Sequence, residues 1–592
     1  MRSLSLVWTV ALVGCGGGGD DGGGGPAPRD EPAEVAPVED AARVDRSVPL
    51  LGGTLLAAAH SDLAFAADPE GDRLLAFDTA ALALLWSVDL PEGSVPFRLA
   101  EGEGALFATL RGSASIARID VATLELTTLA SCAEPRGIAW DADNGALWIA
   151  CASGEIERRD AAGALVSSTW VESDLRDIVP DGDRLLVSRF RSAELLTLDT
   201  ETLDVVARRS PPGHQGTSAI SGVVEVFEAR VAWRLVRGVD GDVMMSNQLH
   251  QASMLSPGTA PVSTPVYYSD STSTSCGIVE SVLTSFPLDG GEPIRTPPIR
   301  DAALPVDIAW NAGAWYLAYG SAAVVGRLDT NAAAGPDICT TLPLVFTAPS
   351  VSSLAFDGSG RALVAGQHPF KISVNGVRIP FEDLADPPKR PTAYATFHAH
   401  TPTQLACASC HPEGSDDAHV WDFGWDGLRR TQNLAVRLSE TAPFHWNGSL
   451  GDMATLVDDV MVTRMLGPQL TDEGSEGLLA WIDGLAPVRV TPSGDAASIA
   501  RGEALFGSEE LACTTCHAGD RFTSPENAHI GKTEVLQTPS LIGVGGRGPW
   551  MHDGCAATLE QRFLDLECGG YTHGGTVAPA DVPDLVAYLE TL

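Results

Sequence analysis

Two short motifs with the pattern Cys-x-x-Cys-His could carry chemistry in this chain. They are Cys407-Ala-Ser-Cys410-His411 and Cys513-Thr-Thr-Cys516-His517. The spacing puts two thiols one helical turn apart, where they can add across the vinyl groups of a haem, and the adjoining imidazole can bind the iron. A zinc site would need a fourth ligand, and a thioredoxin-like pair would need a βαβ setting that neither copy has. The motifs therefore predict two covalent haems c, attached at Cys407, Cys410, Cys513 and Cys516, with His411 and His517 as iron ligands.

The sequence around the motifs is repeated after about 107 residues, which indicates a duplicated structural unit. Each copy runs from its motif through a polar loop and a turn of Pro, aromatic, His and Gly residues to an amphipathic helix, at residues 477–485 and 584–592. We expect two all-α, class-I-like cytochrome c domains, over residues 373–488 and 489–592. The equivalent pairs are Cys407 and Cys513, Thr431 and Thr538, His445 and His552, and Leu485 and Leu592.

The second axial ligand of each iron decides what the haem can do. An iron with two protein ligands transfers electrons, whereas a labile sixth position can bind peroxide or oxygen. In class-I-like domains this ligand lies in the loop before the last helix, where the duplication brings Met465 and His573 to matching positions. A Met ligand raises the potential relative to a second His, so one centre of higher and one of lower potential are predicted. Met461 competes with Met465, and Met551 and His552 compete with His573.

Residues 46–372 repeat a short strand followed by a turn, with an Asp at the end of the strand. The first four Asp residues lie about 40 residues apart, the length of one four-stranded propeller blade. Between them are segments of alternating apolar and polar residues, such as Pro135–Asp141 and Pro305–Asn311. The pattern resembles the YVTN-type, lactonase-like propellers of exported bacterial proteins, which implies an all-β, seven-bladed β-propeller; an array of β-sandwiches is the alternative. The four Asp residues are Asp78, Asp120, Asp160 and Asp199.

We interpret the propeller as a scaffold or docking surface. Nine of the 13 His residues lie after Arg390, so metal chemistry is expected in the C-terminal third. The four in the propeller are widely separated, and such lone residues are more often surface or core residues than ligands. They are His60, His214, His250 and His368.

Further motifs in the C-terminal third point to a known group of proteins. Arg501–Phe506, Thr538–Leu541 and His552–Gly554, with the second Cys-x-x-Cys-His motif, resemble the bacterial di-haem cytochrome c peroxidase and MauG-like superfamily over about 200 residues. Cys407–Glu413, followed by Trp421–Asp422, resembles the first haem half of propeller-fused members. The resemblance implies a di-haem region fused to a propeller.

The resemblance also implies roles for particular residues. In the peroxidases a His after the first haem motif is the labile ligand, which makes His419 the candidate catalytic residue; His398 and His400 could also reach the first haem. His445 and His552 occupy the family's His-x-Gly turn, beside the haem. Ca²⁺ is a further cofactor on family analogy alone.

Two features depart from the peroxidase pattern. The family's axial Met would fall near Leu566, where this chain has no Met. A peroxidase also needs a distal acid or base. Glu440 and Glu413 are the candidates, and neither clearly matches the family's distal Glu. Both departures favour electron transfer over peroxide reduction.

The N-terminus is expected to be removed and lipidated. Residues 1–15 have one positive charge and then an apolar run too short to span a membrane, as in a signal peptide. Leu12–Cys15 resembles a bacterial lipobox, which implies a lipid on Cys15. The Gly-, Asp- and Pro-rich residues 16–45 cannot bury a core and predict a flexible tether. We expect an exported lipoprotein of the periplasm or outer membrane of a Gram-negative bacterium, and Gly16 favours the outer membrane by analogy.

The remaining cysteines and the charge limit the possible partners. Six of the 11 cysteines are used neither by haem nor by lipid, and an oxidising compartment would let them form disulfides. The net charge of -39 excludes a nucleic-acid binder driven by counterion release and suits a positively charged redox partner protein. Pairing by proximity joins Cys132 with Cys151, Cys276 with Cys339, and Cys555 with Cys568.

These observations predict a lipid-anchored di-haem cytochrome c that transfers electrons. The alternatives are a di-haem peroxidase or MauG-like oxidase that reduces hydrogen peroxide, and a propeller-based binding module that the haems serve.

Overall fold

The structure is a computed structural model of the whole chain. The described residues are 46–58, 61–217, 224–239, 241–255, 276–329, 338–347, 350–381, 392–424, 426–530, 534–565, 568 and 574–592. Cys15, the tether, His60 and His573 therefore lie outside the described residues.

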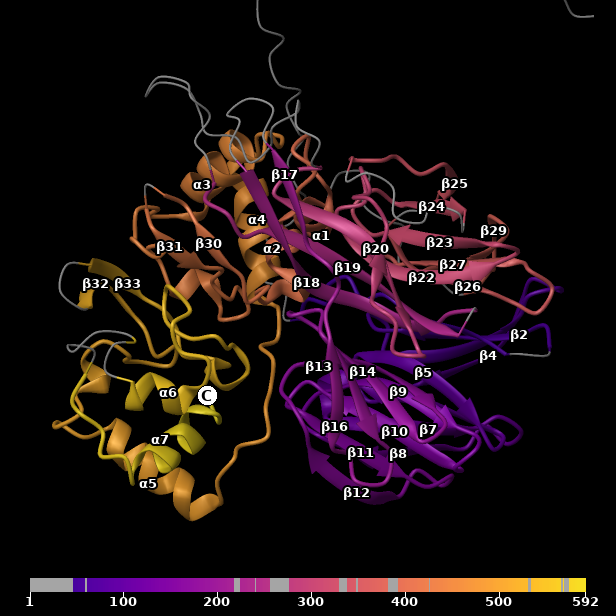
Figure 1. Cartoon of the computed structure of the whole chain (residues 1–592), viewed down its shortest axis with the longest axis horizontal. Helices are drawn as coiled ribbons and strands as arrows, with labels where there is room; N and C mark the ends of the chain where they lie inside the picture. Colours follow the sequence, from indigo (N-terminus) through magenta and orange to yellow (C-terminus); the bar gives the residue numbers. More distant parts are fainter. Residues whose placement is uncertain are drawn as a thin grey trace, which may run out of the picture.

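The predicted seven-bladed β-propeller is confirmed. Seven antiparallel sheets follow one another along the chain, six with four strands and the fifth with five (Figure 1). The strands of the first four blades are β1 (Leu55–Ala57), β2 (Leu63–Asp68), β3 (Arg73–Asp78), β4 (Ala83–Asp89), β5 (Pro96–Gly102), β6 (Ala105–Leu110), β7 (Ser115–Asp120), β8 (Leu126–Ala130), β9 (Pro135–Asp141), β10 (Ala146–Cys151), β11 (Glu155–Arg159), β12 (Leu165–Trp170), β13 (Leu175–Asp181), β14 (Arg184–Arg189), β15 (Leu195–Asp199) and β16 (Val205–Arg209), with a 3₁₀ turn, η1 (Arg111–Ser113), in blade two. Those of the last three are β17 (His214–Thr217), β18 (Val224–Arg237), β19 (Asp242–Gln251), β20 (Val279–Pro287), β21 (Ile294–Arg295), β22 (Pro305–Asn311), β23 (Ala314–Tyr319), β24 (Val324–Asp329), β25 (Leu344–Thr347), β26 (Val351–Phe356), β27 (Ala362–Gly366), β28 (Lys371–Val374) and β29 (Val377–Arg378).

In each of the first four blades the repeated Asp ends the third strand or directly follows it, and builds the turn to the fourth. Asp78 Oδ1 accepts hydrogen bonds from the backbone N–H groups of Ala80 and Ala81, at 2.8 and 2.7 Å. A short carboxylate that binds the backbone just ahead of it favours a turn over a continuing strand, which explains the period seen in the sequence. Asp120 and Asp199 accept in the same way from the residues two and three ahead, and Asp160 accepts from those two and four ahead.

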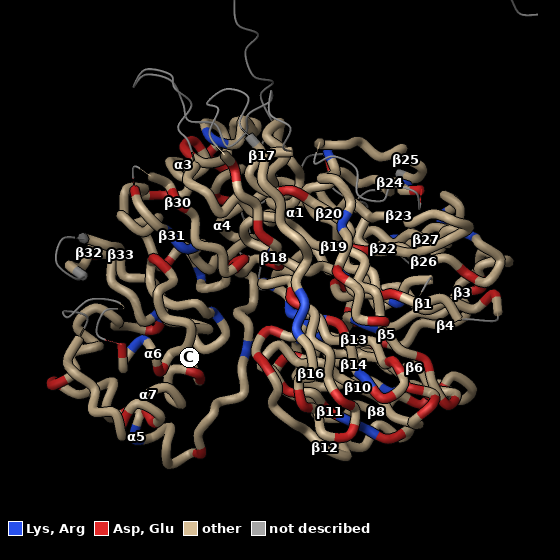
Figure 2. Tube along the Cα trace, in the orientation of Figure 1, with Lys and Arg blue, Asp and Glu red and all other residues tan. Residues whose placement is uncertain are grey.

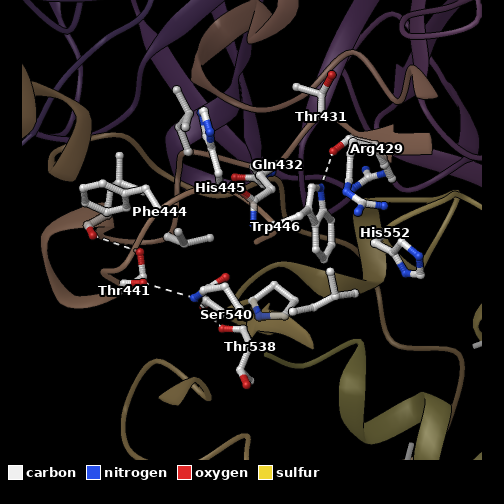
Figure 3. A pocket seen from close by; sticks show the side chains of 18 of the residues that line it. Arg429, Thr431, Gln432, Thr441, Phe444, His445, Trp446, Thr538, Ser540 and His552 are labelled. Atoms are coloured by element: carbon white, nitrogen blue, oxygen red, sulfur yellow. Dashed lines mark hydrogen bonds between the residues drawn. The ribbon is translucent and has the colours of Figure 1, made fainter. Parts of the chain in front are cut away.

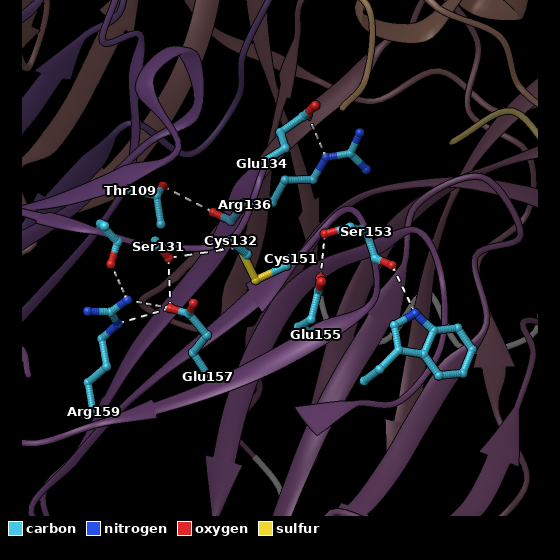
Figure 4. Close-up of a disulfide and its surroundings, with 12 residues drawn as sticks. Thr109, Ser131, Cys132, Glu134, Arg136, Cys151, Ser153, Glu155, Glu157 and Arg159 are labelled. Carbon is cyan, nitrogen blue, oxygen red and sulfur yellow. Dashed lines mark hydrogen bonds and ion pairs between the residues drawn. A yellow bond between two sulfur atoms is a disulfide. The ribbon is translucent and has the colours of Figure 1, made fainter. Parts of the chain in front are cut away.

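Apolar cores between neighbouring blades hold the ring together, and polar contacts close it. The first and last blades share a core that includes Phe77 and Phe370. Thr54 N–H donates to Ser353 Oγ across this junction at 2.8 Å. In blade three a disulfide joins Cys132 at the blade entrance to Cys151 at the end of β10 (Figure 4).

Blade five is longer than the others and reaches out of the propeller. The 14-residue β18 pairs with β17 through its first part and with β19 along its length. Beyond β19, Leu255 N–H donates to the carbonyl of Asp422 in the C-terminal region at 2.8 Å. Cys276, just before β20, forms a disulfide with Cys339.

The C-terminal region follows the propeller as two halves. Blade seven extends to Arg378, the end of β29, so the predicted start of the first half at residue 373 falls inside that blade. The predicted division between the halves, after residue 488, is kept. The first half contains α1 (Ala393–His398), α2 (Cys407–Cys410), η2 (Pro412–Gly414), β30 (Val420–Asp422), β31 (Leu428–Arg430), η3 (Leu438–Glu440), α3 (Met453–Leu456), the π-helix η4 (Val457–Arg464) and α4 (Asp472–Asp483). The second half contains α5 (Ala496–Phe506), η5 (Cys513–Thr515), β32 (Ser524–Ile530), β33 (Glu534–Thr538), η6 (Val544–Gly546), α6 (Leu559–Leu564) and α7 (Val582–Leu589).

The halves are not purely α-helical, because each contains a two-stranded hairpin, β30–β31 or β32–β33. Their helices begin at short polar residues: the Thr471 side chain accepts from Gly474 N–H at the start of α4, and Asp495 accepts from Ser498 N–H at the start of α5. In the second half Gly502 lets α5 approach α7 closely, since a Cβ there would lie 1.9 Å from the carbonyl oxygen of Asp584. This packing explains the Gly in the Arg501–Phe506 motif.

The two halves differ in their cores. One apolar cluster runs from the propeller, at Trp233 and Leu304, into α1 and α4 of the first half, at Phe397 and Trp481. The second half has a separate cluster around α5 to α7, including Leu585. Figure 1 shows the first half beside the propeller and the second half, in yellow, farther from it.

Asp and Glu residues are spread along the chain throughout the propeller and both halves (Figure 2). None of the helices in the described part of the chain is long and apolar enough to cross a membrane.

Candidate haem site

Both Cys-x-x-Cys-His motifs open into one continuous cavity of about 560 Å³ between the two halves. This volume lies within the range of about 300–1,000 Å³ that is typical of ligand pockets. None of the four motif cysteines forms a disulfide, so all four thiols are available for bonding to a ligand. Figure 3 shows the middle of this cavity, where side chains of the first half face those of the second.

The first motif lies on α2 and the turn after it. His411 Nδ1 lies 3.2 Å from the carbonyl oxygen of Ser415, to which it can donate. Burial lowers the pKa of His411, which favours the neutral imidazole that binds metals. A metal-binding His commonly donates its second ring N–H to a carbonyl in this way, which leaves Nε2 as the ligating atom.

In the second motif the His is oriented in the same way, although the local backbone is a 3₁₀ turn rather than an α-helical turn. Its cysteines begin at η5, and His517 Nδ1 lies 2.9 Å from the carbonyl oxygen of Phe522. Burial also lowers the pKa of His517. Both imidazoles are therefore oriented by a backbone carbonyl a few residues ahead of them.

An approximate two-fold relation links the two halves across the cavity. Arg430 N–H donates to the carbonyl of His552 at 2.6 Å, and Gln537 N–H donates to the carbonyl of Trp446 at 2.7 Å. The rings of Trp446 and His552 also meet, with centroids 6.2 Å apart. Equivalent residues of the duplicated sequence thus form reciprocal contacts.

The predicted equivalence of His445 and His552 is wrong by one residue. The left-handed residue of the turn is His445 in the first half, with φ 64°, and Met551 in the second, with φ 73°. Isolated bridges Phe444–Leu450 and Trp550–Ala556 flank the two turns in the same register. His445 therefore corresponds to Met551 and Trp446 to His552, because the turn fixes the register locally while the 107-residue offset came from points outside it.

Several side chains that could supply a sixth ligand line the cavity. Met465 follows the π-helix η4 and is buried in a cluster that Cys410 contacts, which puts it on the side of the first motif. Met461 and His445 line the same cavity. Burial and the nearby Arg464 lower the pKa of His445 to about 4.

On the side of the second motif, Met551 and His552 line the cavity, while His573 lies outside the described residues. The structure thus keeps the alternatives of the sequence analysis and adds His445 to them.

His419 does not occupy the place that the resemblance implied. Its Nδ1 accepts from Arg230 Nε at 3.2 Å, and its Nε2 donates to the carbonyl of Gln251 at 3.0 Å, both in blade five. Its ring packs edge-on against Trp421, which separates it from the cavity that Trp421 lines. With both nitrogens engaged, His419 is not available as an iron ligand in this arrangement.

The other predicted alternatives also lie away from the cavity. His398 Nδ1 donates to the carbonyl of Tyr394 at 2.7 Å, and its Nε2 accepts from Leu50 N–H at 3.2 Å. Glu440 is on the surface, paired with Arg521 at 2.9 Å. Neither carboxylate proposed as a distal acid reaches the cavity, since Glu413 points into the propeller.

Two features of the cavity were missed by the sequence analysis. Leu255 and Ile278 of blade five form part of its wall, beside Met465. The cavity wall is also rich in arginine for a protein of net charge -39, and Asp426 is the only acid among its described lining residues, although Asp416 and Asp459 pair with two of the arginines from outside the lining. Its cations are Arg429, Arg430, Arg464, Arg547 and Arg562.

The three disulfides join the pairs expected from proximity. Cys555–Cys568 belongs to the second half, at a sequence separation of 13, and the other two belong to the propeller. No group of three or more His, Cys, Asp or Glu residues in the described part of the chain could hold a metal ion, and the calcium expectation stays a prediction.

A seven-bladed propeller with a duplicated Cys-x-x-Cys-His region is the class of protein that this fold and site define. Methylamine utilization protein MauG of Methylorubrum extorquens is 28% identical over 221 residues, covering 29% of this chain and 60% of MauG. The resemblance to MauG is therefore confirmed, although the chain spans less than two thirds of that relative. No family model matches the chain.

Two solved structures resemble the chain with low similarity. Kuenenia stuttgartiensis hydrazine synthase has a TM-score of 0.44 at 15% identity, covering 58% of this chain and 99% of that chain. A streptogramin B lyase has a TM-score of 0.38 at 13% identity, covering 56% and 95%.

Proposed function

We propose that this protein is a di-haem c-type cytochrome that transfers electrons between redox partners. The observation that carries the proposal is the single cavity into which both Cys-x-x-Cys-His motifs open, each with its His oriented by a backbone carbonyl. A bound haem c would supply one-electron chemistry, because its iron alternates between the ferric and ferrous states.

The residues of the cavity fit haem c in three respects. Cys407 and Cys410 in the first half, and Cys513 and Cys516 in the second, are thiols that line the cavity. The buried imidazoles are held neutral and oriented for Nε2 ligation. The arginines match the two propionates that each haem carries, since a guanidinium binds a carboxylate through paired hydrogen bonds.

Of these arginines, Arg547 has the greatest need of an anionic partner. It is buried, and burial together with Arg430 lowers its pKa to about 10, so it stays charged at neutral pH. Its contact with the carbonyl of Ser540, at 2.6 Å, fixes the guanidinium at the cavity wall. Among the described residues no carboxylate forms an ion pair with Arg547, and such a buried cation is a suitable partner for an anionic group of the ligand.

The contacts between the halves would set the distance between the two centres. The reciprocal hydrogen bonds of Arg430 and Gln537, and the packing of Trp446 on His552, join the halves at the middle of the cavity. They would hold the two motifs at a fixed separation. Met465 is our choice of sixth ligand for the first haem and His573 for the second.

We propose further that the protein is exported and anchored to a membrane by a lipid on Cys15. Three disulfides support an oxidising compartment such as the periplasm. The acidic surface would steer a positively charged partner protein toward the molecule.

Counting haems and their spin states tests the main proposal. We expect two haems per chain by pyridine haemochrome assay, one in each of the variants Cys407→Ala/Cys410→Ala and Cys513→Ala/Cys516→Ala, and low-spin spectra in the ferric protein. A chain that binds no haem during expression with the cytochrome c maturation system would refute it.

A second candidate function, reduction of hydrogen peroxide, is favoured by the sequence match to MauG. It requires one centre whose sixth position can open. Addition of hydrogen peroxide to the half-reduced protein tests it: a high-spin signal with peroxide turnover by an electron donor would favour the peroxidase, and an unchanged spectrum would exclude it.

A further inference from the structure

The carboxylate of Glu413 lies inside the propeller although the residue belongs to the haem region. Glu413 is two residues after His411 in the sequence and has a left-handed backbone, with φ 54°. Its side chain is buried and forms ion pairs with Arg111, at 2.8 Å, and Arg176, at 2.6 Å. Arg176 stands near the start of β13, and Arg111 begins η1.

These cations belong to a larger charged cluster that we call the arginine crown. Arg136, near the start of β9, pairs with Glu134 and Asp174, each at 3.1 Å, and Glu134 also pairs with Arg111 at 2.7 Å. Figure 4 shows the contact between Glu134 and Arg136 beside the Cys132–Cys151 disulfide. The crown consists of Arg111, Arg136 and Arg176 with the acids Glu134 and Asp174.

Arg176 makes Glu413 necessary to the crown. Its side chain is fully buried, and its guanidinium lies over the rings of Phe97 and Phe190, at 4.9 and 4.3 Å from their centroids. In the described part of the chain Glu413 is the only acid paired with Arg176. A buried guanidinium with no carboxylate partner is strongly unfavourable, so the crown holds the Glu413 side chain firmly.

The turn that carries Glu413 also carries the group that orients His411. Gly414 N–H donates to the carbonyl of His411 at 3.0 Å, and Ser415 N–H donates to the carbonyl of Pro412 at 3.1 Å. The Ser415 carbonyl is the one that His411 Nδ1 faces. A short hydrogen-bonded turn thus connects a side chain fixed in the propeller to the imidazole of the first motif.

The second motif lacks this connection. Gly519 stands at the position equivalent to Glu413, two residues after the motif His, and it is exposed. His517 is oriented by Phe522, within its own half. The two motifs therefore have the same Cys and His residues, but only the first is joined to the propeller by an ion-paired side chain.

We infer that Glu413 is a positioning residue through which the propeller sets the orientation of His411, and thereby the reduction potential of the first haem but not of the second. The inference rests on the proposed function. Its physical basis is that the hydrogen bond to the second ring nitrogen controls both the angle and the basicity of a ligating imidazole, and that ligand basicity tunes the potential of the iron.

Three variants of the full-length holoprotein test the inference. Glu413→Asp keeps the charge but withdraws the carboxylate by one methylene, Glu413→Gln removes the charge, and Arg176→Met removes its partner. Glu476→Gln, on the exposed face of α4, is the matched control. The readouts are haem content, the two midpoint potentials from a spectroelectrochemical titration, and the electron paramagnetic resonance signals of the two ferric haems.

We expect all variants to keep two haems. Glu413→Asp, Glu413→Gln and Arg176→Met should each shift one midpoint potential and the resonance signal of the same haem, and the other haem should match wild type. The control should change neither. If Glu413→Gln folds poorly, Glu413→Asp still decides the question, because it keeps the ion pair charges.

Two results would overturn the inference. One is an unchanged potential and signal in both Glu413→Asp and Arg176→Met. The other is a pure charge effect. In that case Glu413→Gln would raise the potential of the first haem and Arg176→Met would lower it. The double variant Glu413→Gln/Arg176→Met would restore the wild-type potential, and Glu413→Asp would leave it unchanged. Absence of haem from the wild-type protein would instead refute the proposed function, so the two failures are distinguishable.

Discussion

The two halves of the C-terminal region carry the same motif in different surroundings. The first half shares an apolar core with the propeller and adds the ion pairs of Glu413. The second half has a core of its own and a disulfide, Cys555–Cys568, within it. Duplication has therefore preserved the Cys-x-x-Cys-His motif and the turn of each half, while the means of stabilising the two halves have diverged.

This difference implies that destabilising substitutions should affect the unfolding of the two halves separately. A half that shares its core with a large neighbour should unfold with that neighbour, whereas a half with its own core should unfold as an independent unit. The first haem would then report on the propeller, and the second haem would not.

Truncation of the two cores gives the largest contrast. Trp481, which packs on Phe397 with ring centroids 5.0 Å apart, belongs to the shared core, and Leu585 belongs to the core of the second half. We expect Trp481→Ala to cost about 3–5 kcal/mol and Leu585→Ala about 2–5 kcal/mol. In calorimetry the first should lower the transition of the propeller with the first half, and the second should lower a separate transition. One common transition in both variants would contradict the distinction.

Removal of the Cys555–Cys568 disulfide tests how much this bond stabilises the second half. The bond closes a loop with a sequence separation of 13, for which the chain-entropy model gives a loss of about 3 kcal/mol. We expect Cys555→Ser/Cys568→Ser to lower only the transition of the second half. The matched control, Cys132→Ser/Cys151→Ser, lies in blade three and should lower only the other transition.

Acid should weaken the junction between propeller and first half. Burial lowers the pKa of His398 from 6.5 to about 3, because its ring accepts from Leu50 N–H and has no room for a second proton. As the pH is lowered, the unfolded chain takes up a proton on this His near pH 6.5, whereas the folded chain does so only near pH 3. The free energy of unfolding therefore decreases as the pH is lowered from 6.5 to about 3.

The slope is about 1.4 kcal/mol per pH unit, or about 2 kcal/mol between pH 6.5 and 5. His398→Gln keeps an acceptor for Leu50 and should flatten this slope in denaturant titrations at several pH values. His529→Gln, at an exposed position of the second half, is the control. An equal slope in wild type and His398→Gln would remove His398 from the explanation.

The smallest effect is expected where the halves touch at the surface. Glu440 of the first half pairs with Arg521 of the second at 2.9 Å, with side chains that are 46% and 25% exposed. Glu440→Gln should change stability by about 0–1 kcal/mol and leave both haem spectra unchanged, since exposed ion pairs contribute little. A larger loss would mean that the halves depend on this edge more than on the contacts in the cavity.

Features governed by local sequence were predictable. The haem motifs follow from the chemistry of adjacent residues, and the propeller period follows from Asp residues such as Asp78 that bind the backbone of the next two or three residues. Two of the disulfide pairs are also close in sequence, at separations of 19 and 13. In these cases the determining contacts lie within a short segment of chain, whereas Cys276 and Cys339 are 63 residues apart.

Features set by contacts between distant segments were not predictable. His419 could be paired with the first haem on paper because Arg230 and Gln251, which bind both of its nitrogens, are more than 160 residues away. The place of Glu413 depends likewise on cations from two different blades. The equivalence of His445 and Met551 was also missed, because an average offset between the two copies does not reveal a local shift of one residue.

The reciprocal hydrogen bonds between Arg430 and His552 and between Gln537 and Trp446 have the form of an isologous interface, in which the same patch is used on both sides. A single ancestral half could have met a second copy of itself through this patch as a symmetric dimer. Joining the two copies in one polypeptide raises their effective concentration, so a small contact suffices to keep them paired. It also frees each copy to change alone, which a symmetric dimer of one gene product cannot do.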